Sequence, residues 1–347
     1  MTPAAIQAGR TGAGGRRVLL LAAGLGAANL AAWLWALATF RAYPMLLGTA
    51  VLAYGLGLRH AVDADHIAAI DNVTRKLRQA GQRPATVGLF FSLGHSTVVV
   101  LATLGIVASA TAFRAEFARL QEIGGAIGTL VSAGFLFVIA AVNAAILCGT
   151  WRTLLRLRAA PAAEADWQGL LAGDGPLARL LRPAFRLIGR SWHMYPLGLL
   201  FGLGFDTASE VGLLGISAAE AAKGLPLWSI LVLPALFTAG MSLVDTADGV
   251  LMLNAYDWAF ARPLRKLYYN LAITFLSVLV AVLVGGIELL QLAAARLGLD
   301  GPFWRAVGAA GDHFGLVGYL VIGMFAALWL GSAVFFRVRD RASAAPG

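Results

Sequence analysis

Four short stretches of the sequence place histidines, carboxylates and hydroxyls within apolar surroundings. The densest is residues 59–66, RHAVDADH, which carries two imidazoles and two carboxylates within seven positions. Its candidate residues are Arg59, His60, Asp63, Asp65 and His66. Imidazole nitrogens together with carboxylate oxygens suit divalent transition metals such as Ni, Co, Zn, Cu and Fe. A structural ion pair with Arg59 is the alternative, but four ligand-type side chains this close together favour a metal site.

The other three stretches are residues 91–97 (FSLGHST), 204–210 (GFDTASE) and 240–249 (GMSLVDTADG). Their candidate residues are His95, Ser96, Asp206, Thr207, Glu210, Asp245 and Asp248. The first two acids are spaced i,i+4 and the last two i,i+3, so each pair shares one face of a helix. Hydrogen bonding between helices is the alternative for each acidic pair, and a core hydrogen bond is the alternative for His95.

The first stretch does not fit one face of a regular helix. On an ideal helix, His60, Asp63 and His66 share an arc of about 120°, whereas Asp65 falls on the other side. Either Asp65 faces a different partner, or the helix unwinds here. Metal sites on broken intramembrane helices are a known solution in transporters.

The elements that carry these residues are predicted to be transmembrane helices. Of the 347 residues, 59% are hydrophobic and only 13% are charged, and the mean hydropathy is +0.76. A soluble domain has about 25% charged residues, so a soluble fold is excluded. Eight apolar segments are long enough to span a bilayer: 18–40, 42–70, 85–113, 123–150, 194–217, 224–244, 267–287 and 314–336. We therefore predict an all-α polytopic membrane protein. The single cysteine, Cys148, excludes a disulfide framework and a thiolate metal site.

Basic residues predict the orientation of the chain. When loops are assigned alternately to the two sides, 20 of the 27 Lys and Arg residues fall on the side of the N-terminus, and the second loop contributes Arg75, Lys76, Arg78 and Arg83. The positive-inside rule then places both termini in the cytoplasm. The predicted organisation is a cytoplasmic arm (1–17), a four-helix half (18–150), a cytoplasmic linker (151–193), a second four-helix half (194–336) and a cytoplasmic tail (337–347).

Six acids lie inside the predicted helices, in three of the four stretches, and all four stretches lie at a similar depth. A lone carboxylate at mid-membrane costs about 2.5–3.5 kcal/mol, so these acids must line a wet cavity, pair with cations or bind metal. A shift of 147 residues aligns 55–57 with 202–204, 89–90 with 236–237, and Asp63 with Glu210. Either helices 2–3 and 5–6 form an inverted repeat, or these few identities are chance matches in apolar sequence.

The four motifs, in this order on eight predicted helices, resemble the nickel/cobalt transporter family. The resemblance covers residues 45–335, and its main signature, His-x4-Asp-His, is matched by His60, Asp65 and His66. It implies a high-affinity permease that imports Ni²⁺ or Co²⁺ across a bacterial cytoplasmic membrane. The family pattern assigns His60, Asp63, Asp65, His66 and His95 to the metal, and Asp206, Glu210, Asp245, Asp248, Arg59, Ser96 and Thr207 to the pathway around it.

Two functions other than import are alternatives: an intramembrane metal-dependent enzyme and a metal exporter. The HExxH zinc-protease helix is absent from the sequence, and so is a Walker glycine-rich loop with its lysine. The sequence contains no His-rich loop of the kind that captures metal in efflux proteins. We therefore expect a transporter rather than an enzyme, with the metal ion as substrate, the bilayer as surroundings, and no prosthetic group, ATPase partner or nucleic acid. The choice between nickel and cobalt, the energy source and the oligomeric state stay open.

Overall fold

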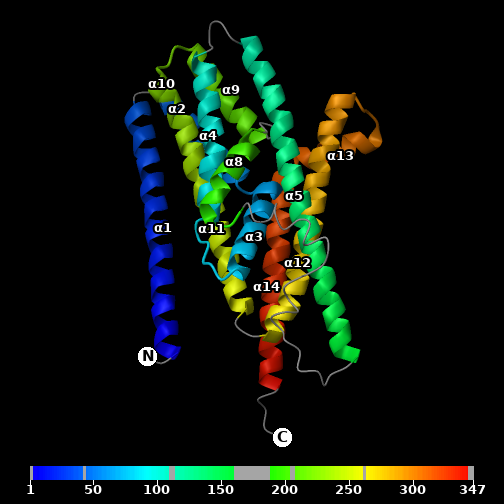
Figure 1. Cartoon of the computed structure of the whole chain (residues 1–347). Helices are drawn as coiled ribbons and strands as arrows, with labels where there is room; N and C mark the ends of the chain where they lie inside the picture. Colours follow the sequence, from blue (N-terminus) through cyan, green and yellow to red (C-terminus); the bar gives the residue numbers. More distant parts are fainter. Residues whose placement is uncertain are drawn as a thin grey trace.

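The computed structural model describes residues 3–41, 44–108, 114–159, 188–203, 208–260 and 263–342 (Figure 1). Within these ranges every regular element is a helix, so the protein is the all-α polytopic membrane protein that its sequence predicts. The helices before the linker are α1 (Pro3–Phe40), α2 (Pro44–His60), α3 (Ala64–Gln79), α4 (Val87–Ala108) and α5 (Arg114–Ala159). After it come η1 (Ser191–His193), α8 (Met194–Gly202), α9 (Ala208–Ala222), α10 (Leu227–Ile230), α11 (Val232–Phe260), α12 (Pro263–Leu297), α13 (Pro302–Asp312) and α14 (Phe314–Ala342).

The predicted arm and linker are only partly described. Helix α1 begins at Pro3 and therefore includes most of the arm (1–17), and α14 continues to Ala342 within the predicted tail. Helix α5 extends to Ala159, so the first residues of the predicted linker are helical. Residues 160–187 of that linker lie outside the described residues.

Among the described residues, six helices are individually long and apolar enough to cross a membrane, fewer than the eight predicted. A seventh span is added if α2 and α3, bent by 52° across a short break, count as one. The remaining predicted segment, 194–217, is divided between α8 and α9, which have 9 and 15 residues, less than the roughly 20 a crossing needs. Helix α1 begins and α14 ends on the same side of the bundle (Figure 1). A chain whose two ends lie on the same side crosses the membrane an even number of times. The number of crossings is even when α2 with α3 form one crossing and α8 with α9 form another.

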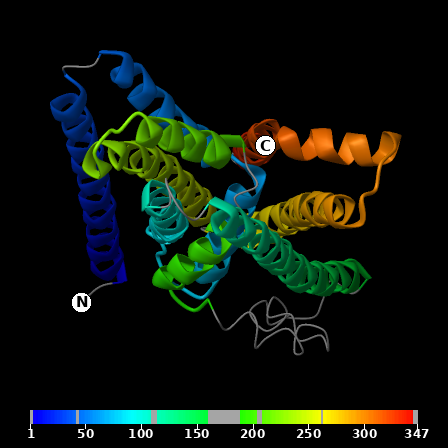
Figure 2. The same ribbon diagram turned by 90° about the horizontal axis from the view of Figure 1, so that it is seen from above.

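Large apolar side chains are exposed on the outside of the bundle. Leu30 on α1, Leu283 on α12 and Leu320 on α14 are 61%, 54% and 67% exposed. Figure 2 shows α1 at the edge of the bundle, and only 6% of the most apolar 18-residue stretch of α1 is buried inside the protein. Hydrocarbon tails, which are as apolar as leucine, are suitable surroundings for such surfaces.

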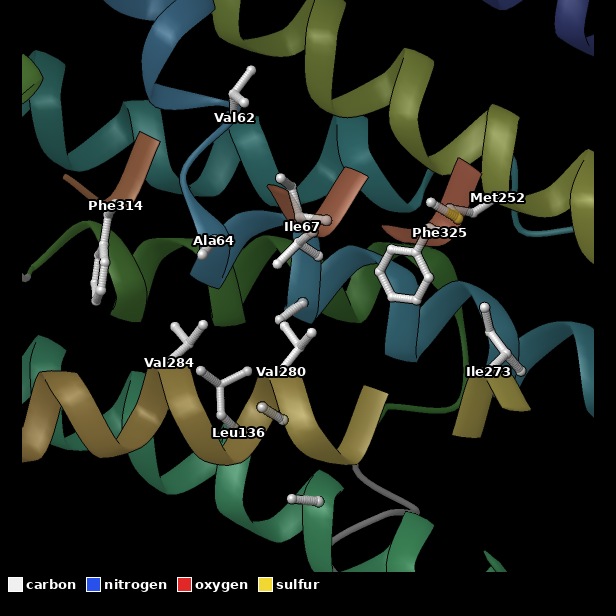
Figure 3. Packing of buried hydrophobic residues seen from close by; sticks show 14 of the residues in the cluster. Val62, Ala64, Ile67, Leu136, Met252, Ile273, Val280, Val284, Phe314 and Phe325 are labelled. Carbon is white, nitrogen blue, oxygen red and sulfur yellow. The ribbon is translucent and has the colours of Figure 1, made fainter. Parts of the chain in front are cut away.

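Helix α3 occupies the centre of the bundle. It contacts α4, α5, α11, α12 and α14, and nearly every residue from Ala64 to Leu77 is buried. In Figure 3, Ile67 of α3 packs among Val280 and Val284 of α12 and Phe325 of α14. The other helices therefore enclose a helix whose own sequence is polar.

The prediction that Arg75 lies in a basic surface loop was wrong. Arg75 is 3% exposed and lies within α3, because that helix continues to Gln79. Its guanidinium donates to Thr274 Oγ1 at 2.7 Å and to Asn72 Oδ1 at 3.0 Å. These hydrogen bonds satisfy a charged group that would be costly to bury alone. The hydropathy pattern ends near Ile70, so it does not reveal this buried polar half of α3.

Glycines permit close approach of helices at the break between α2 and α3. A Cβ atom on Gly318 of α14 would overlap the carbonyl oxygen of Val62, which lies in the break. Gly94 of α4 and Gly198 of α8 likewise face the backbone carbonyls of Tyr195 and Phe91. Small residues at helix interfaces let backbones approach closely in membranes, and here they hold α14 and α8 against the polar motifs.

We expect Gly318→Ala to destabilise the protein by about 1–3 kcal/mol, because the new methyl group meets backbone rather than a flexible side chain. Gly323→Ala on the same helix is the matched control. No atom lies within 4 Å of a Cβ at that position, so the change should stay within about 0.5 kcal/mol of neutral or stabilise α14 slightly. Thermal unfolding of both variants in detergent measures the difference. Equal stability of the two variants would contradict the packing described.

Candidate metal centre

The break between α2 and α3 brings the two histidines of the first motif together. His60 is the last residue of α2, and His66 lies in the first turn of α3. Between them Asp63 has an extended conformation (φ −64°, ψ 145°) and directly precedes α3. Of the two alternatives for this motif, the interruption of the helix is the one the structure adopts.

Three histidines form a buried cluster at this break. His60, His66 and His95 are 1%, 0% and 3% exposed, and one nitrogen from each lies within 4.8 Å of those of the others. Their ring centroids are 4.6–4.9 Å apart. Helices α2, α3 and α4 each contribute one ring, so the cluster forms only when these three helices pack.

Glu210 in the first turn of α9 adds a carboxylate oxygen to the cluster. Its Oε1 lies 2.8 Å from His95 Nε2 and 4.0 Å from His60 Nε2, and the two Nε2 atoms are 2.9 Å apart. The midpoint between His60 Nε2 and Glu210 Oε1 is 2.0 Å from both atoms, and the three separations put His95 Nε2 at about 2.0 Å from it as well. Imidazole–metal bonds have this length, about 2.0–2.1 Å.

Two carboxylates orient the histidines from outside the cluster. Asp63 Oδ2 lies 3.0 Å from His60 Nδ1, and Asp245 Oδ1 of α11 lies 3.3 Å from His66 Nδ1. Such contacts set the ring orientation and leave Nε2 to face a metal. His66 Nε2 has no hydrogen-bond partner among the described residues. Asp63, expected among the metal ligands, thus contacts the nitrogen of His60 that faces away from the cluster.

The other predicted residues take different positions. Asp65 is half-buried, and its charge acts on both His60 and His66. Arg59 Nη1 donates to Ser209 Oγ of α9 at 3.2 Å. Ser96, beside His95, is 2% exposed, and its hydroxyl has no hydrogen-bond partner among the described residues. Asp206 and Thr207 lie outside the described residues.

The sequence interpretation missed two groups of residues. The ring of Phe91 packs edge-on against that of His66, with 4.8 Å between the ring centroids, and the ring centroid of Phe237 lies 5.6 Å from that of His60. Aromatic rings therefore shield the cluster. Asp71, Asn72 and Arg75 form a buried polar group further along α3. Their close spacing directly after the first motif is a signal that α3 continues as a polar helix.

These features define the class of protein. It is a multi-pass helical membrane protein with a buried cluster of imidazole and carboxylate donors at the junction of α2, α3, α4 and α9. Donors of this kind, buried at the break of a bent span, are typical of an ion-binding site in a membrane transporter.

Comparison with known proteins gives the family. The family model described as high-affinity nickel-transport protein matches residues 46–335, and this chain belongs to that family. It is 57% identical to a high-affinity nickel transport protein of Cupriavidus necator, over 97% of this chain and 96% of the relative. It is 45% identical to the high-affinity nickel-transport protein NixA of Helicobacter pylori (84% and 88% covered). It is 43% identical to the cobalt transport protein NhlF of Rhodococcus rhodochrous (85% and 84% covered). No solved structure matches the chain significantly.

Proposed function

We propose that the protein imports Ni²⁺, Co²⁺ or both across the cytoplasmic membrane of a bacterium. The observation that carries the proposal is the donor set of His60, His95 and Glu210, which surrounds a point about 2.0 Å from each of three ligand atoms. Relatives named for nickel and for cobalt transport support this substrate class. His66 Nε2 is a fourth donor, and Asp63, Asp65 and Asp245 supply the negative charge around the ion.

The family and its relatives, which are named as transporters, support transport rather than catalysis. The ion would exchange its water for imidazole and carboxylate donors within the bundle and then leave toward the cytoplasm. A negative-inside membrane potential contributes about 2.3 kcal/mol per charge per 100 mV, so a divalent ion gains about twice that on entry. With both termini cytoplasmic, as the basic residues predict, the C-terminal ends of α3 and α11 face the cytoplasm.

Helix packing supports the inverted repeat as the basis of this movement. In such a repeat α2 would be the equivalent of α8, α3 of α9 and α4 of α11. The contact between α2 and α11 is then equivalent to the contact between α8 and α4, and both contacts are extensive. In the same way, the pair His66–Asp245 is equivalent to the pair Glu210–His95. Ser92 and Ser242 would be equivalents that meet at the axis, and their hydroxyls are 3.0 Å apart. These equivalences correspond to shifts of 144 residues (His66 to Glu210) and 150 residues (Ser92 to Ser242), so they differ from the 147-residue shift, which aligns Asp63 with Glu210 and 89–90 with 236–237.

Uptake of ⁶³Ni²⁺ and ⁵⁷Co²⁺ by cells that express the protein tests the proposal. Because imidazole donors favour these ions over harder ones, we expect saturable uptake that unlabelled Ni²⁺ or Co²⁺ inhibits and a tenfold excess of Mn²⁺ does not. Cells with the empty vector are the control. Accumulation at or below the control level would contradict import, and a lower level than the control would favour the exporter.

A further inference from the structure

Helices α3 and α11 are joined by polar contacts at two levels. Near the start of α3, His66 Nδ1 lies 3.3 Å from Asp245 Oδ1 of α11. Near the end of α3, Arg78 Nε donates to Asp257 Oδ1 of α11. Each contact joins residues that are 179 positions apart in the chain, so the two helices run parallel and in register. At 1.5 Å per residue, the second contact lies about 18 Å beyond the first, on the side that the proposed orientation makes cytoplasmic.

Between these two levels the helices are tightly packed. Ile70, Val73 and Leu77 of α3 are buried, and so is Tyr256 of α11. The Tyr256 hydroxyl also donates a hydrogen bond to the Asp71 carboxylate of α3. An ion that leaves the histidine cluster between α3 and α11 therefore needs the two helices to separate.

The contact at the far end of the helices is partly exposed. The side chains of Arg78 and Asp257 are 24% and 28% exposed. Arg83, in the turn after α3, adds a second cation, and its Nη2 lies 3.6 Å from Asp257 Oδ2. Ion pairs that are open to solvent are weak, so they break and form again readily. This contact is therefore suited to opening, whereas the contact at His66 is fully buried.

The same end of α3 holds the segment that leads into α8. Lys76 Nζ donates to the carbonyl of Ile188 at 2.7 Å, and Gln82 Nε2 donates to the carbonyl of Gly189 at 2.9 Å. Helix α8 precedes α9, which carries Glu210 in its first turn. The end of α3 is thus attached both to α11 and to the segment before α8.

We propose that Asp257, together with Arg78 and Arg83, forms a cytoplasmic latch between α11 and α3 that is closed while the ion occupies the histidine cluster and opens to release it. The inference rests on the proposed import function and its orientation. Helices α3 and α11 also carry His66 and Asp245 at the cluster. Because a tilt about the cluster displaces the far end of a helix most, the latch lies where a small change at the cluster has the largest effect.

Access of a thiol reagent from the cytoplasmic side tests the latch without transport. In a Cys148→Ser background, Thr74→Cys places the only thiol at a fully buried position of α3, between the cluster and the latch. Labelling by a membrane-impermeant maleimide is followed in inside-out vesicles. We expect Asp257→Ala to raise the labelling rate at least tenfold, because the ends of α3 and α11 then separate more often. Asp300→Ala removes an exposed acid that accepts only from the Gly301 amide, and it should leave the rate within about twofold. An unchanged rate in Asp257→Ala would overturn the latch.

A covalent bridge across the latch tests whether it must open during transport. In the same Cys148→Ser background, Arg78→Cys/Asp257→Cys is joined by a bifunctional methanethiosulfonate, which a reductant cleaves. We expect the bridge to lower ⁶³Ni²⁺ uptake at least tenfold and reduction to restore it to within about twofold. Equilibrium binding of ⁶³Ni²⁺ to the purified, bridged protein should stay within about twofold of the unbridged protein. A monofunctional methanethiosulfonate is the control and should leave uptake unchanged.

Two results of the bridging experiment would contradict the latch. One is uptake that the bridge does not slow, and the other is a bridge that abolishes metal binding, because the effect would then lie at the histidine cluster rather than at release. Failure of the unaltered protein to take up metal would instead refute the proposed import function. The labelling experiment would still decide the latch in that case, because it does not depend on transport.

Discussion

Replacing His60 by alanine is expected to abolish metal uptake while the protein remains in the membrane. The substitution removes one of the nitrogens that lie about 2.0 Å from the shared midpoint, and it leaves Asp63 without its partner on α2. Substitutions of residues that only orient metal ligands cost about 10–100-fold in affinity or activity, so loss of a ligand should exceed 100-fold. Initial rates of ⁶³Ni²⁺ uptake, normalised to the amount of protein in the membrane, measure it.

His313→Ala is the matched control for this prediction. His313 is exposed after α13, and its Nδ1 contacts only the carbonyl of Ala309 at 2.8 Å. It removes the same kind of side chain from an exposed position that is not part of the cluster, so uptake should stay within about twofold of the unaltered protein. Normal uptake by His60→Ala would refute the histidine cluster as the transport site, whatever the control shows.

Replacing Glu210 by glutamine is the second change with a large expected effect. Glutamine has the shape of glutamate and still presents an oxygen to His95, but it carries no charge. A carboxylate opposite His60 neutralises half of the charge of a divalent ion in a site of low dielectric constant, so its loss weakens binding strongly. We expect the KM for Ni²⁺ to rise at least 30-fold and the maximal rate to fall, as measured by uptake over a range of Ni²⁺ concentrations.

Glu220→Gln on the same helix is the matched control. It shows whether the effect of Glu210→Gln comes from the lost charge at the histidine cluster or from a general disturbance of α9. Glu220 is also buried, but it pairs with Lys223 at 2.8 Å, three turns from Glu210. Its substitution should change the KM by less than about threefold. An equal effect of both substitutions would show that Glu210 acts by supporting α9 rather than by binding the ion.

The first motif shows how far the sequence interpretation reaches. The types and spacing of His60, Asp65 and His66 are sufficient to predict a metal site, because few other arrangements put so many ligand groups inside a membrane. They do not predict which groups face the ion. An ideal helix puts Asp63 on the same face as both histidines, whereas the break before α3 turns it to the outer nitrogen of His60. A break changes every side-chain direction after it, and hydropathy does not record it.

In the second half of α3 the sequence interpretation failed, because it placed buried residues at the membrane surface. Asp71 and Arg75 are charged residues at the end of an apolar segment, and such residues usually lie at the membrane surface. In this bundle α3 is enclosed by α5, α11, α12 and α14. Tyr256 and Asn143 donate hydrogen bonds to its polar groups, and Thr274 accepts one from Arg75. These partners lie 71 to 199 residues away in the chain, a separation that local pattern cannot bridge.

By itself, the sequence determined the membrane class, most of the long helices and the four motifs, because these follow from composition and from local spacing along the chain. The tertiary structure alone decided that the two histidines flank a break in the helix, that Glu210 lies against His60 and His95, and that buried polar side chains continue along α3. The contacts of Glu210 and the burial of α3 depend on packing between helices that are distant in sequence.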